Sequence, residues 1–229
     1  MPCYNQARFL PQALVSVAHQ TRRPDLFVTV DDGSSDGTPI VLADFWENSI
    51  LDGHGMLHRS NRGSAAAINT GVARIATEVD ALSWVSSDNV MTPEWLQTLG
   101  KAMEDRKAGV VYSGFWFCPP RRARSYLFTQ HSQDRLLKDV NCYYGPSFLI
   151  RSDVWQEAGP HRGKISHDYD HWLRVEEVCF RRGLPIVGVD KGLCEYNAHD
   201  ERATVVRKQE FDAFHWQAEA KRRRRDAAV

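Results

Sequence analysis

Short apolar runs alternate with amphipathic stretches along the first 117 residues. The apolar runs have the length of buried strands, and between them apolar side chains recur at the spacing of a helix. The expected strands are residues 27–30, 55–59, 81–85 and 110–117. The expected helices are residues 10–18, 38–48, 64–76 and 92–105, and two of them open on the pairs Thr38-Pro39 and Thr92-Pro93. The alternation of strands and helices predicts βαβ units, and therefore an α/β fold with a mostly parallel sheet flanked by helices.

After residue 117 the pattern is less regular. Strands are expected at residues 143–150 and 186–189, and a helix at residues 168–182 ended by Gly183. A last helix is expected at residues 204–224. We interpret residues 1–229 as one domain. Residues 1–117 form its nucleotide-binding half, residues 118–203 its more irregular half, and residues 204–229 a C-terminal helix with a basic tail.

The N-terminus resembles the exit of a strand, yet no strand precedes it. An α/β sheet that binds ligand at strand ends needs such a strand near its centre. We therefore expect the first strand to be missing, or another segment to fill the place beside residues 27–30. An open slot there would argue against the doubly wound sheet.

Composition narrows the class of protein. With 42% hydrophobic and 25% charged residues, the 229-residue chain can bury a large core. No apolar run has the ~20 residues of a membrane span, and no secretion signal is visible, so a cytoplasmic location is expected. Without residues 221–229 the chain has 24 basic and 28 acidic residues, which disfavours nucleic-acid binding. The five scattered cysteines indicate reduced thiols.

Acidic strings follow two of the predicted strands. Residues 30–38 read Val-Asp-Asp-Gly-Ser-Ser-Asp-Gly-Thr, and residues 86–89 read Ser-Ser-Asp-Asn. In open α/β sheets ligands bind outside the carboxyl ends of strands, so these carboxylates could receive a nucleoside and a divalent cation. Alternatively, they are ordinary turn and capping residues.

Two later strings carry further candidates. Asp168 stands at the start of a predicted helix, where it could serve as a general base or merely cap the helix. His199 stands in a predicted loop; it is a structural residue unless it approaches Asp88, in which case a mixed O/N ligand set would suit Mn²⁺.

Taken together, these strings resemble the family 2 inverting glycosyltransferases of the GT-A fold. The acidic string 30–38 matches throughout, and the resemblance covers about residues 2–200. The other matching residues are Pro2, Tyr4, Asn5, Phe9, Leu10, Gln20, Thr21, Asn61, Arg62, Gly63, Ala66, Asn69 and Gly71.

The resemblance implies a transfer of sugar from a nucleoside diphosphate sugar, with a UDP-sugar as the expected donor, to a hydroxyl acceptor on a glycan or lipid. It implies Asp168 as the catalytic base and Mn²⁺ or Mg²⁺ on Asp88 and His199. The residues implied to hold the nucleotide sugar are Pro2, Tyr4, Asp32, which would contact the base, Arg62, Ser87 and Asp88.

The chain departs from the family pattern at four positions. Ser86 replaces the first Asp of the Asp-x-Asp motif, and Asn89 follows Asp88 where another Asp is common. His167 replaces the Glu before the base, and Asn197 replaces the Arg before His199. Fewer negative charges then surround the cation, which weakens the expectation of metal dependence more than that of the fold.

Two other functions stay open. A non-catalytic nucleotide-sugar-binding module would fit the missing strand and the thinned metal motif. A sugar nucleotidyltransferase would carry a Gly-rich loop near its N-terminus, and residues 1–20 contain no Gly.

The basic run at the C-terminus also has two interpretations. It could contact anionic lipid at the inner membrane face, or it is a solvated helix end whose cations suit the helix dipole. The run consists of Lys221, Arg222, Arg223, Arg224 and Arg225.

Overall fold

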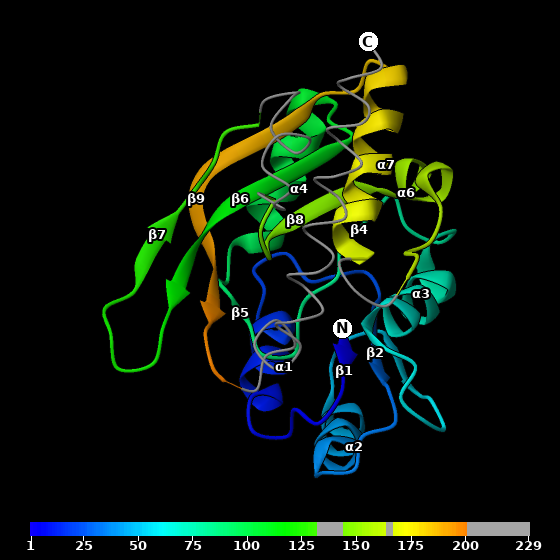
Figure 1. Ribbon diagram of the computed structural model, residues 1–229, viewed down its shortest axis with the longest axis vertical. Helices are drawn as coiled ribbons and strands as arrows, with labels where there is room; N and C mark the ends of the chain where they lie inside the picture. Colours follow the sequence, from blue (N-terminus) through cyan, green and yellow to red (C-terminus); the bar gives the residue numbers. More distant parts are fainter. Residues whose placement is uncertain (132–143, 164–166, 201–229) are drawn as a thin grey trace, which may run out of the picture.

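The computed structural model describes residues 1–131, 144–163 and 167–200 (Figure 1). The strands are β1 (Pro2–Cys3), β2 (Phe27–Asp31), β3 (Gly53–Leu57), β4 (Ala81–Leu82), β5 (Val90–Met91), β6 (Val110–Cys118), β7 (Ser125–Leu127), β8 (Phe148–Arg151) and β9 (Ile186–Asn197). The helices are α1 (Leu10–Ala18), α2 (Thr38–Asn48), α3 (Ser64–Ile75), α4 (Trp95–Arg106), α6 (Ser152–Ala158) and α7 (His167–Arg181). The predicted alternation of strand and helix is confirmed through β6.

Two hydrogen-bonded sheets form the centre of the molecule. The first is parallel, in the order β1-β2-β3. The second has the order β4-β8-β6-β9-β5, with β7 paired to β6. In it β6 and β9 are parallel, whereas β8 and β7 run antiparallel to β6. Every antiparallel pair in this sheet includes a strand that follows β6 in the chain. In that part of the chain the sequence pattern also loses its regular alternation.

The first strand is present, but it is only two residues long. Pro2 and Cys3 pair in parallel with Val30 and Asp31 of β2, and so they fill only part of the place beside residues 27–30. Next to it a cavity of 810 Å³ extends from Met1 along β2 and separates the two sheets. The expectation that such an opening would argue against the doubly wound arrangement is wrong. The sheet β1-β2-β3 is still parallel, and helices α1 and α2 still connect its strands.

Pairing partners explain where strand ends differ from the prediction. β3 begins at Gly53 rather than residue 55, because its register is set by Phe27 of β2. β4 shortens to Ala81–Leu82, since only its β8 side has a partner strand. β9 continues past residue 189 to Asn197 alongside the long β6.

The helix predicted from Thr92 begins three residues later, at Trp95. The Thr92 N–H donates to the Leu193 carbonyl, and the Thr92 carbonyl accepts from the Gln20 side chain. These tertiary contacts fix Thr92 just after β5, and its carbonyl also accepts from the Trp95 N–H in the turn that precedes the helix. Thr38, by contrast, begins α2 as predicted.

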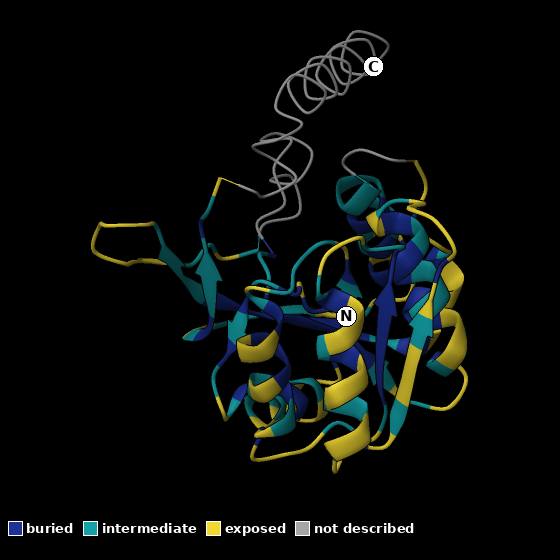
Figure 2. Cartoon of the chain, turned by 90° about the horizontal axis from the view of Figure 1, so that it is seen from below, coloured by how far each residue is buried: buried dark blue, intermediate teal, exposed yellow. Residues whose placement is uncertain are grey.

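The core consists of clusters that the sheets share with the helices. The largest lies between the second sheet and α6 and α7, around Trp172, Tyr112 and Phe148. Figure 2 shows buried residues at the strands and exposed ones on the outer sides of the helices. Within the described ranges, no helix combines the length and apolar character needed to cross a bilayer. The expected helix at residues 204–224 and the basic run 221–225 lie outside the described residues.

Candidate functional site

The acidic loop (residues 31–38) is locked to the segment after β1. Asn5 N–H donates to Ser34 Oγ at 2.9 Å, and Ser35 N–H donates to Asn5 Oδ1 at 2.8 Å. Asp36 accepts from the N–H groups of Ala7 and Thr38. These reciprocal bonds hold the ends of β1 and β2 in one fixed arrangement, which leaves Tyr4 between them 45% exposed.

Asp32 is buried and its carboxylate is fully engaged. Its two oxygens accept from the backbone N–H of Arg62 at 3.0 and 3.1 Å and from that of Gly63 at 2.7 Å. His58 Nδ1 lies 2.6 Å from Asp32 Oδ1, and His58 Nε2 lies 2.9 Å from Thr70 Oγ1. A carboxylate has about four acceptor positions. In this structure the acceptor positions of Asp32 are taken by His58 and by the backbone of residues 62 and 63. Asp32 therefore fixes the segment that carries the exposed Arg62 side chain.

The neighbouring carboxylate has an acceptor to spare. Asp31 Oδ1 accepts from Ser34 N–H at 3.0 Å and from Ser34 Oγ at 2.6 Å. Asp31 Oδ2 is buried and has no hydrogen-bond partner among the described residues. A buried carboxylate oxygen without a donor is costly. This oxygen has no surface that a ligand could contact in this structure.

Asp88 meets His199 across the second sheet. His199 Nε2 lies 3.1 Å from Asp88 Oδ2, and the Asn197 side chain donates to the Asp88 carbonyl at 2.7 Å. The His199 ring stacks on Phe9, with centroids 4.2 Å apart. The loop after β4, the end of β9 and the residue before α1 thus lie close together. His199 approaches Asp88, which was the condition for a role of His199 as a metal ligand.

This pair suits a divalent cation. Adjacent ligands of an octahedral ion with bonds of about 2.1 Å lie about 3.0 Å apart, close to the 3.1 Å observed. A carboxylate oxygen and an imidazole nitrogen form the donor set expected for Mn²⁺. Among the described residues no third His, Cys, Asp or Glu joins them, so the remaining ligands would have to come from solvent and donor.

Asp168 lies in the first turn of α7, which is tied to α3 by polar contacts. His167 Nε2 lies 2.7 Å from Ser64 Oγ, at the start of α3. His167 Nδ1 lies 2.9 Å from His161 Nδ1, and the backbone of His161 exchanges two hydrogen bonds with the Asn69 side chain. Asp168 itself is only partly buried, and its Oδ1 accepts from the N–H of Tyr169. Its carboxylate is therefore held in position without being enclosed.

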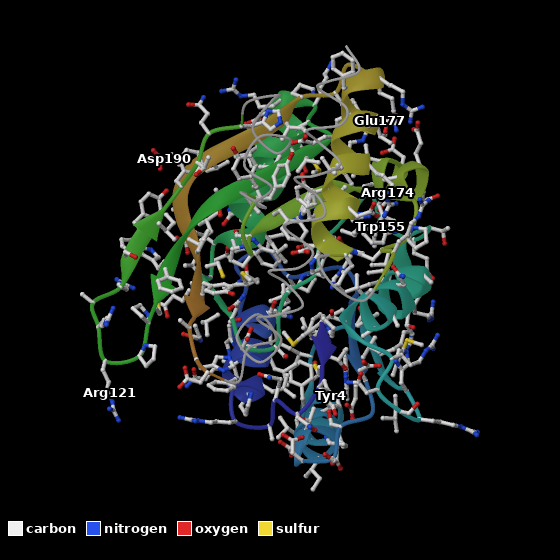
Figure 3. All side chains as sticks on the ribbon, viewed as in Figure 1. Tyr4, Arg121, Trp155, Arg174, Glu177 and Asp190 are labelled. Carbon is white, nitrogen blue, oxygen red and sulfur yellow. The ribbon has the colours of Figure 1, made fainter. Side chains whose placement is uncertain are left out.

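Two buried histidines, His161 and His171, stack near Asp168, and the partly exposed His167 packs edge-on against His161. His161 and His171 lie 4.2 Å apart between Trp84 and Trp155. Burial, with the neighbouring histidines adding to it, lowers the pKa of His161 to about 2. Burial, with Arg174 and His167 adding to it, lowers the pKa of His171 to about 3. Both rings are neutral near pH 7 and belong to the support of α7. In Figure 3, Trp155 and Arg174 lie together on this side of the molecule.

The candidate residues gather around the carboxyl ends of β1 and β2. Asp32 N–H donates to the Cys3 carbonyl, and Ser87, next to Asp88, interacts with the Cys3 thiol. From Asp32 the contacts continue through Gly63 and the adjacent Ser64 to His167, which precedes Asp168. Pro2 lies within β1 itself. The cavity of 810 Å³ is separate: its lining includes none of the three carboxylates.

Acceptor contacts are expected from residues 121–139 and 143–148, and part of these segments lies outside the described residues. Residues 132–143 are not described, and residues 121–131 form the loop around β7. Figure 3 shows Arg121 pointing outward at the tip of the β6–β7 hairpin, away from Tyr4. An acceptor role for residues 121–139 and 143–148 stays a prediction.

Comparison with known proteins defines the family. The family model described as Glycosyl transferase family 2 matches residues 1–159, and the chain belongs to this family. An uncharacterized glycosyltransferase of Rickettsia prowazekii is 25% identical over 192 residues, covering 78% of this chain and 58% of that protein. One of Rickettsia typhi is 25% identical over 231 residues, covering 93% and 67%.

Solved structures show the fold. Staphylococcus aureus TarS 1–349 in complex with UDP-GlcNAc superposes with a TM-score of 0.71 at 16% identity, covering 88% of this chain and 58% of that one. The mannosyltransferase PcManGT of Pyrobaculum calidifontis, in complex with GDP-Man and Mn²⁺, gives 0.70 at 16% identity, covering 96% and 62%. The fold is of the GT-A type, as predicted. The chain spans only about three fifths of these two structures.

Several contributing residues escaped sequence reasoning. Asn197 and His167, which the sequence marked only as departures from the family pattern, hold Asp88 and the start of α7. Ser64 and His58 carried no signal, because their partners are 103 and 26 residues away along the chain. Asp31 was visible as half of an acidic pair, but nothing in the sequence shows which of two adjacent carboxylates is occupied.

Proposed function

We propose that the protein is an inverting glycosyltransferase that moves a sugar from a nucleoside diphosphate sugar, with UDP as the expected nucleotide, to a hydroxyl acceptor. The observation that carries the proposal is the approach of His199 to Asp88, together with the contacts that lead from Asp32 through Gly63 and Ser64 to His167, next to Asp168. Family membership and the nucleotide-sugar complexes of the superposed proteins support it.

In the proposed reaction Asp168 takes the proton of the acceptor hydroxyl. The acceptor oxygen attacks the anomeric carbon as the bond from that carbon to the diphosphate oxygen breaks on the opposite face, so the configuration inverts. The nucleoside diphosphate leaves with the electron pair of that bond. A cation held by Asp88 and His199 would neutralise the negative charge that develops on the diphosphate.

The chain's own residues position the donor. Asp32 holds residues 62 and 63 so that the Arg62 side chain can reach the nucleotide from the solvent side. Pro2, the exposed Tyr4 and Ser87 would complete the nucleotide site, and His167 keeps Asp168 at its edge.

A donor screen tests the proposal. UDP-, GDP- and dTDP-sugars are added with Mn²⁺, and melting temperature and release of nucleoside diphosphate are measured. One donor class should stabilise the protein and be hydrolysed or transferred. Asp88→Asn should abolish both effects, and Asp105→Asn, which removes an exposed carboxylate of α4, should abolish neither.

Two results would contradict the proposal. Binding without hydrolysis or transfer, across a panel of hydroxyl acceptors, would favour a non-catalytic nucleotide-sugar-binding module. Full activity in EDTA would remove the role assigned to the cation. A sugar nucleotidyltransferase has no support from the comparisons.

A further inference from the structure

His167 makes a contact through each nitrogen of its ring. Its Nε2 lies 2.7 Å from Ser64 Oγ, and its Nδ1 lies 2.9 Å from His161 Nδ1. His161 Nδ1 also lies 3.2 Å from the backbone carbonyl of His167, which can only accept, so His161 Nδ1 carries a hydrogen and donates it. The other tautomer would bury a donor at His161 Nε2, which has no partner among the described residues.

The hydrogen on His161 determines the position of the hydrogen on His167. Burial lowers the pKa of His167, with the Asp168 carboxylate opposing the shift, so near pH 7 the ring is neutral and has one hydrogen. His167 Nδ1 faces a donor and therefore accepts, which leaves the hydrogen on Nε2. His167 Nε2 thus donates to Ser64 Oγ. A Glu at position 167 could only accept, and it would take the hydroxyl hydrogen of Ser64 instead.

Ser64 therefore keeps its own hydroxyl hydrogen for another acceptor. Its side chain is exposed at the start of α3, whereas the next residue, Ala65, is buried. Serine at a helix start often bonds to the helix backbone, but here the bond of Ser64 Oγ goes to His167. The hydroxyl is thus a donor that is held in place and lies at the surface.

Ser64 lies between the two parts of the candidate site. The backbone directly before it is held by the Asp32 carboxylate, and its partner His167 directly precedes Asp168. Figure 1 shows the two helices that carry these residues, α3 and α7, next to each other. In a single displacement the transferred sugar lies between the diphosphate that leaves and the hydroxyl whose proton the base takes. A side chain between the nucleotide-holding segment and the base is therefore placed beside that sugar.

We propose that Ser64 is a specificity-determining residue whose hydroxyl donates a hydrogen bond to an oxygen of the transferred sugar, and that His167 orients this hydroxyl. The proposal rests on the glycosyltransferase reaction proposed above and adds a contact with the sugar itself. A nucleoside diphosphate without a sugar cannot make this bond. The contribution of Ser64 therefore appears in the affinity for the nucleotide sugar and not in the affinity for the diphosphate.

The test compares nucleotide sugars with their diphosphates. UDP-glucose, UDP-GlcNAc, GDP-mannose and dTDP-glucose are titrated by calorimetry in Mn²⁺, beside UDP, GDP and dTDP. For the nucleotide sugar that binds best, Ser64→Ala should lower the affinity about tenfold, which equals about 1.4 kcal/mol and is the size of one hydrogen bond. Affinity for the matching diphosphate should stay within about twofold, because it loses no bond. Ser64→Thr keeps the hydroxyl and should retain the affinity for the sugar.

Ser49→Ala is the matched control, because it also removes a hydroxyl that makes a hydrogen bond to the chain, and it should change neither affinity. Equal losses for nucleotide sugar and diphosphate in Ser64→Ala would show a merely structural role. Unchanged affinity for the nucleotide sugar, with or without a raised KM for the acceptor, would show that the hydroxyl does not contact the sugar. These results overturn the inference and leave the proposed function standing. Wild-type protein that binds none of the seven probes would overturn both.

Discussion

The acidic loop at residues 31–38 and the Asp88–His199 pair differ in how their carboxylates are used. Asp31, Asp32 and Asp36 accept hydrogen bonds from backbone groups of three segments, and six of these bonds measure 2.7–3.1 Å. Among the described residues, the Asp88 carboxylate contacts the side chain of His199. The loop that carries the strongest sequence motif is mainly framework. The carboxylates left for chemistry, Asp88 and Asp168, stand in weaker motifs.

The largest expected effect follows from replacing Asp168. Asp168→Asn removes the proposed base and keeps the shape of the side chain, so kcat should fall by roughly 10²–10⁴-fold with donor binding nearly unchanged. Steady-state kinetics and donor titration measure the two quantities. Asp170→Asn, two residues further along α7 and paired with Arg174, is the control and should keep kcat within a few-fold. Normal turnover of the Asp168 variant would end its assignment as the base.

Replacing Asp32 tests the framework side of the comparison. Asp32→Asn puts an amide NH₂ against the N–H groups of Arg62 or Gly63, where a carboxylate now accepts from both. Hydrogen bonds to charged groups contribute about 1.5–3 kcal/mol, so the free energy of unfolding should fall by about 2–4 kcal/mol in urea titration. Asp105→Asn should change it by less than about 0.5 kcal/mol. A stable Asp32 variant that has lost only donor affinity would make Asp32 a ligand residue instead.

Acid should weaken the support of α7. His161 and His171 have folded-state pKa values below their ordinary value, so the unfolded chain binds more protons and stability falls as pH drops below 6.5. Between pH 6.5 and 5 the loss should be about 1–3 kcal/mol, at up to 1.4 kcal/mol per pH unit for each group. His171→Phe should flatten this slope in urea titrations, and the exposed His19→Gln should not. An equal slope in both variants would contradict the burial of these rings as its cause.

The smallest effect is expected at Asn197. Asn197→Ala removes the bond to the Asp88 carbonyl and loosens the Asp88–His199 pair. Residues that orient metal ligands typically contribute 10–100-fold to affinity, and we expect the lower figure because the bond is to backbone. The Mn²⁺ concentration for half-maximal donor binding should rise about tenfold. Asn48→Ala, at the end of α2, is the matched control. No change at Asn197 would mean that β9 does not orient the pair.

The fold was largely predictable because its strongest signals are local. The period of apolar residues located β2, α2, α3 and β6, and Gly183 marked the end of α7. Strand ends depended on partners far along the chain. β4 ends early where it faces the cavity, and β9 lengthens beside β6. Neither effect can be read from the segment itself.

The sequence predicted which motifs lie close together in the site. It did not predict which carboxylate oxygens are already hydrogen-bonded within the chain. The family resemblance implied that His199 lies near Asp88, and the two side chains are in contact. The occupancy of Asp32 by the N–H groups of Arg62 and Gly63 arises from a segment 30 residues further along the chain. Asp31 and Asp32 have identical side chains, and only the folded backbone determines the direction in which each one points.

The central claim is that Asp88 and His199 hold the cation of a nucleotide-sugar donor beside Asp168. The most direct measurement is NMR line broadening by Mn²⁺ in the presence of UDP, with Mg²⁺ as the diamagnetic reference. The account predicts broadening of the backbone amides of Ser87, Asn197 and Asp168, none at Lys107 at the far end of α4, and loss of the effect in Asp88→Asn. Broadening that survives Asp88→Asn, or that spares Asp168, would contradict it.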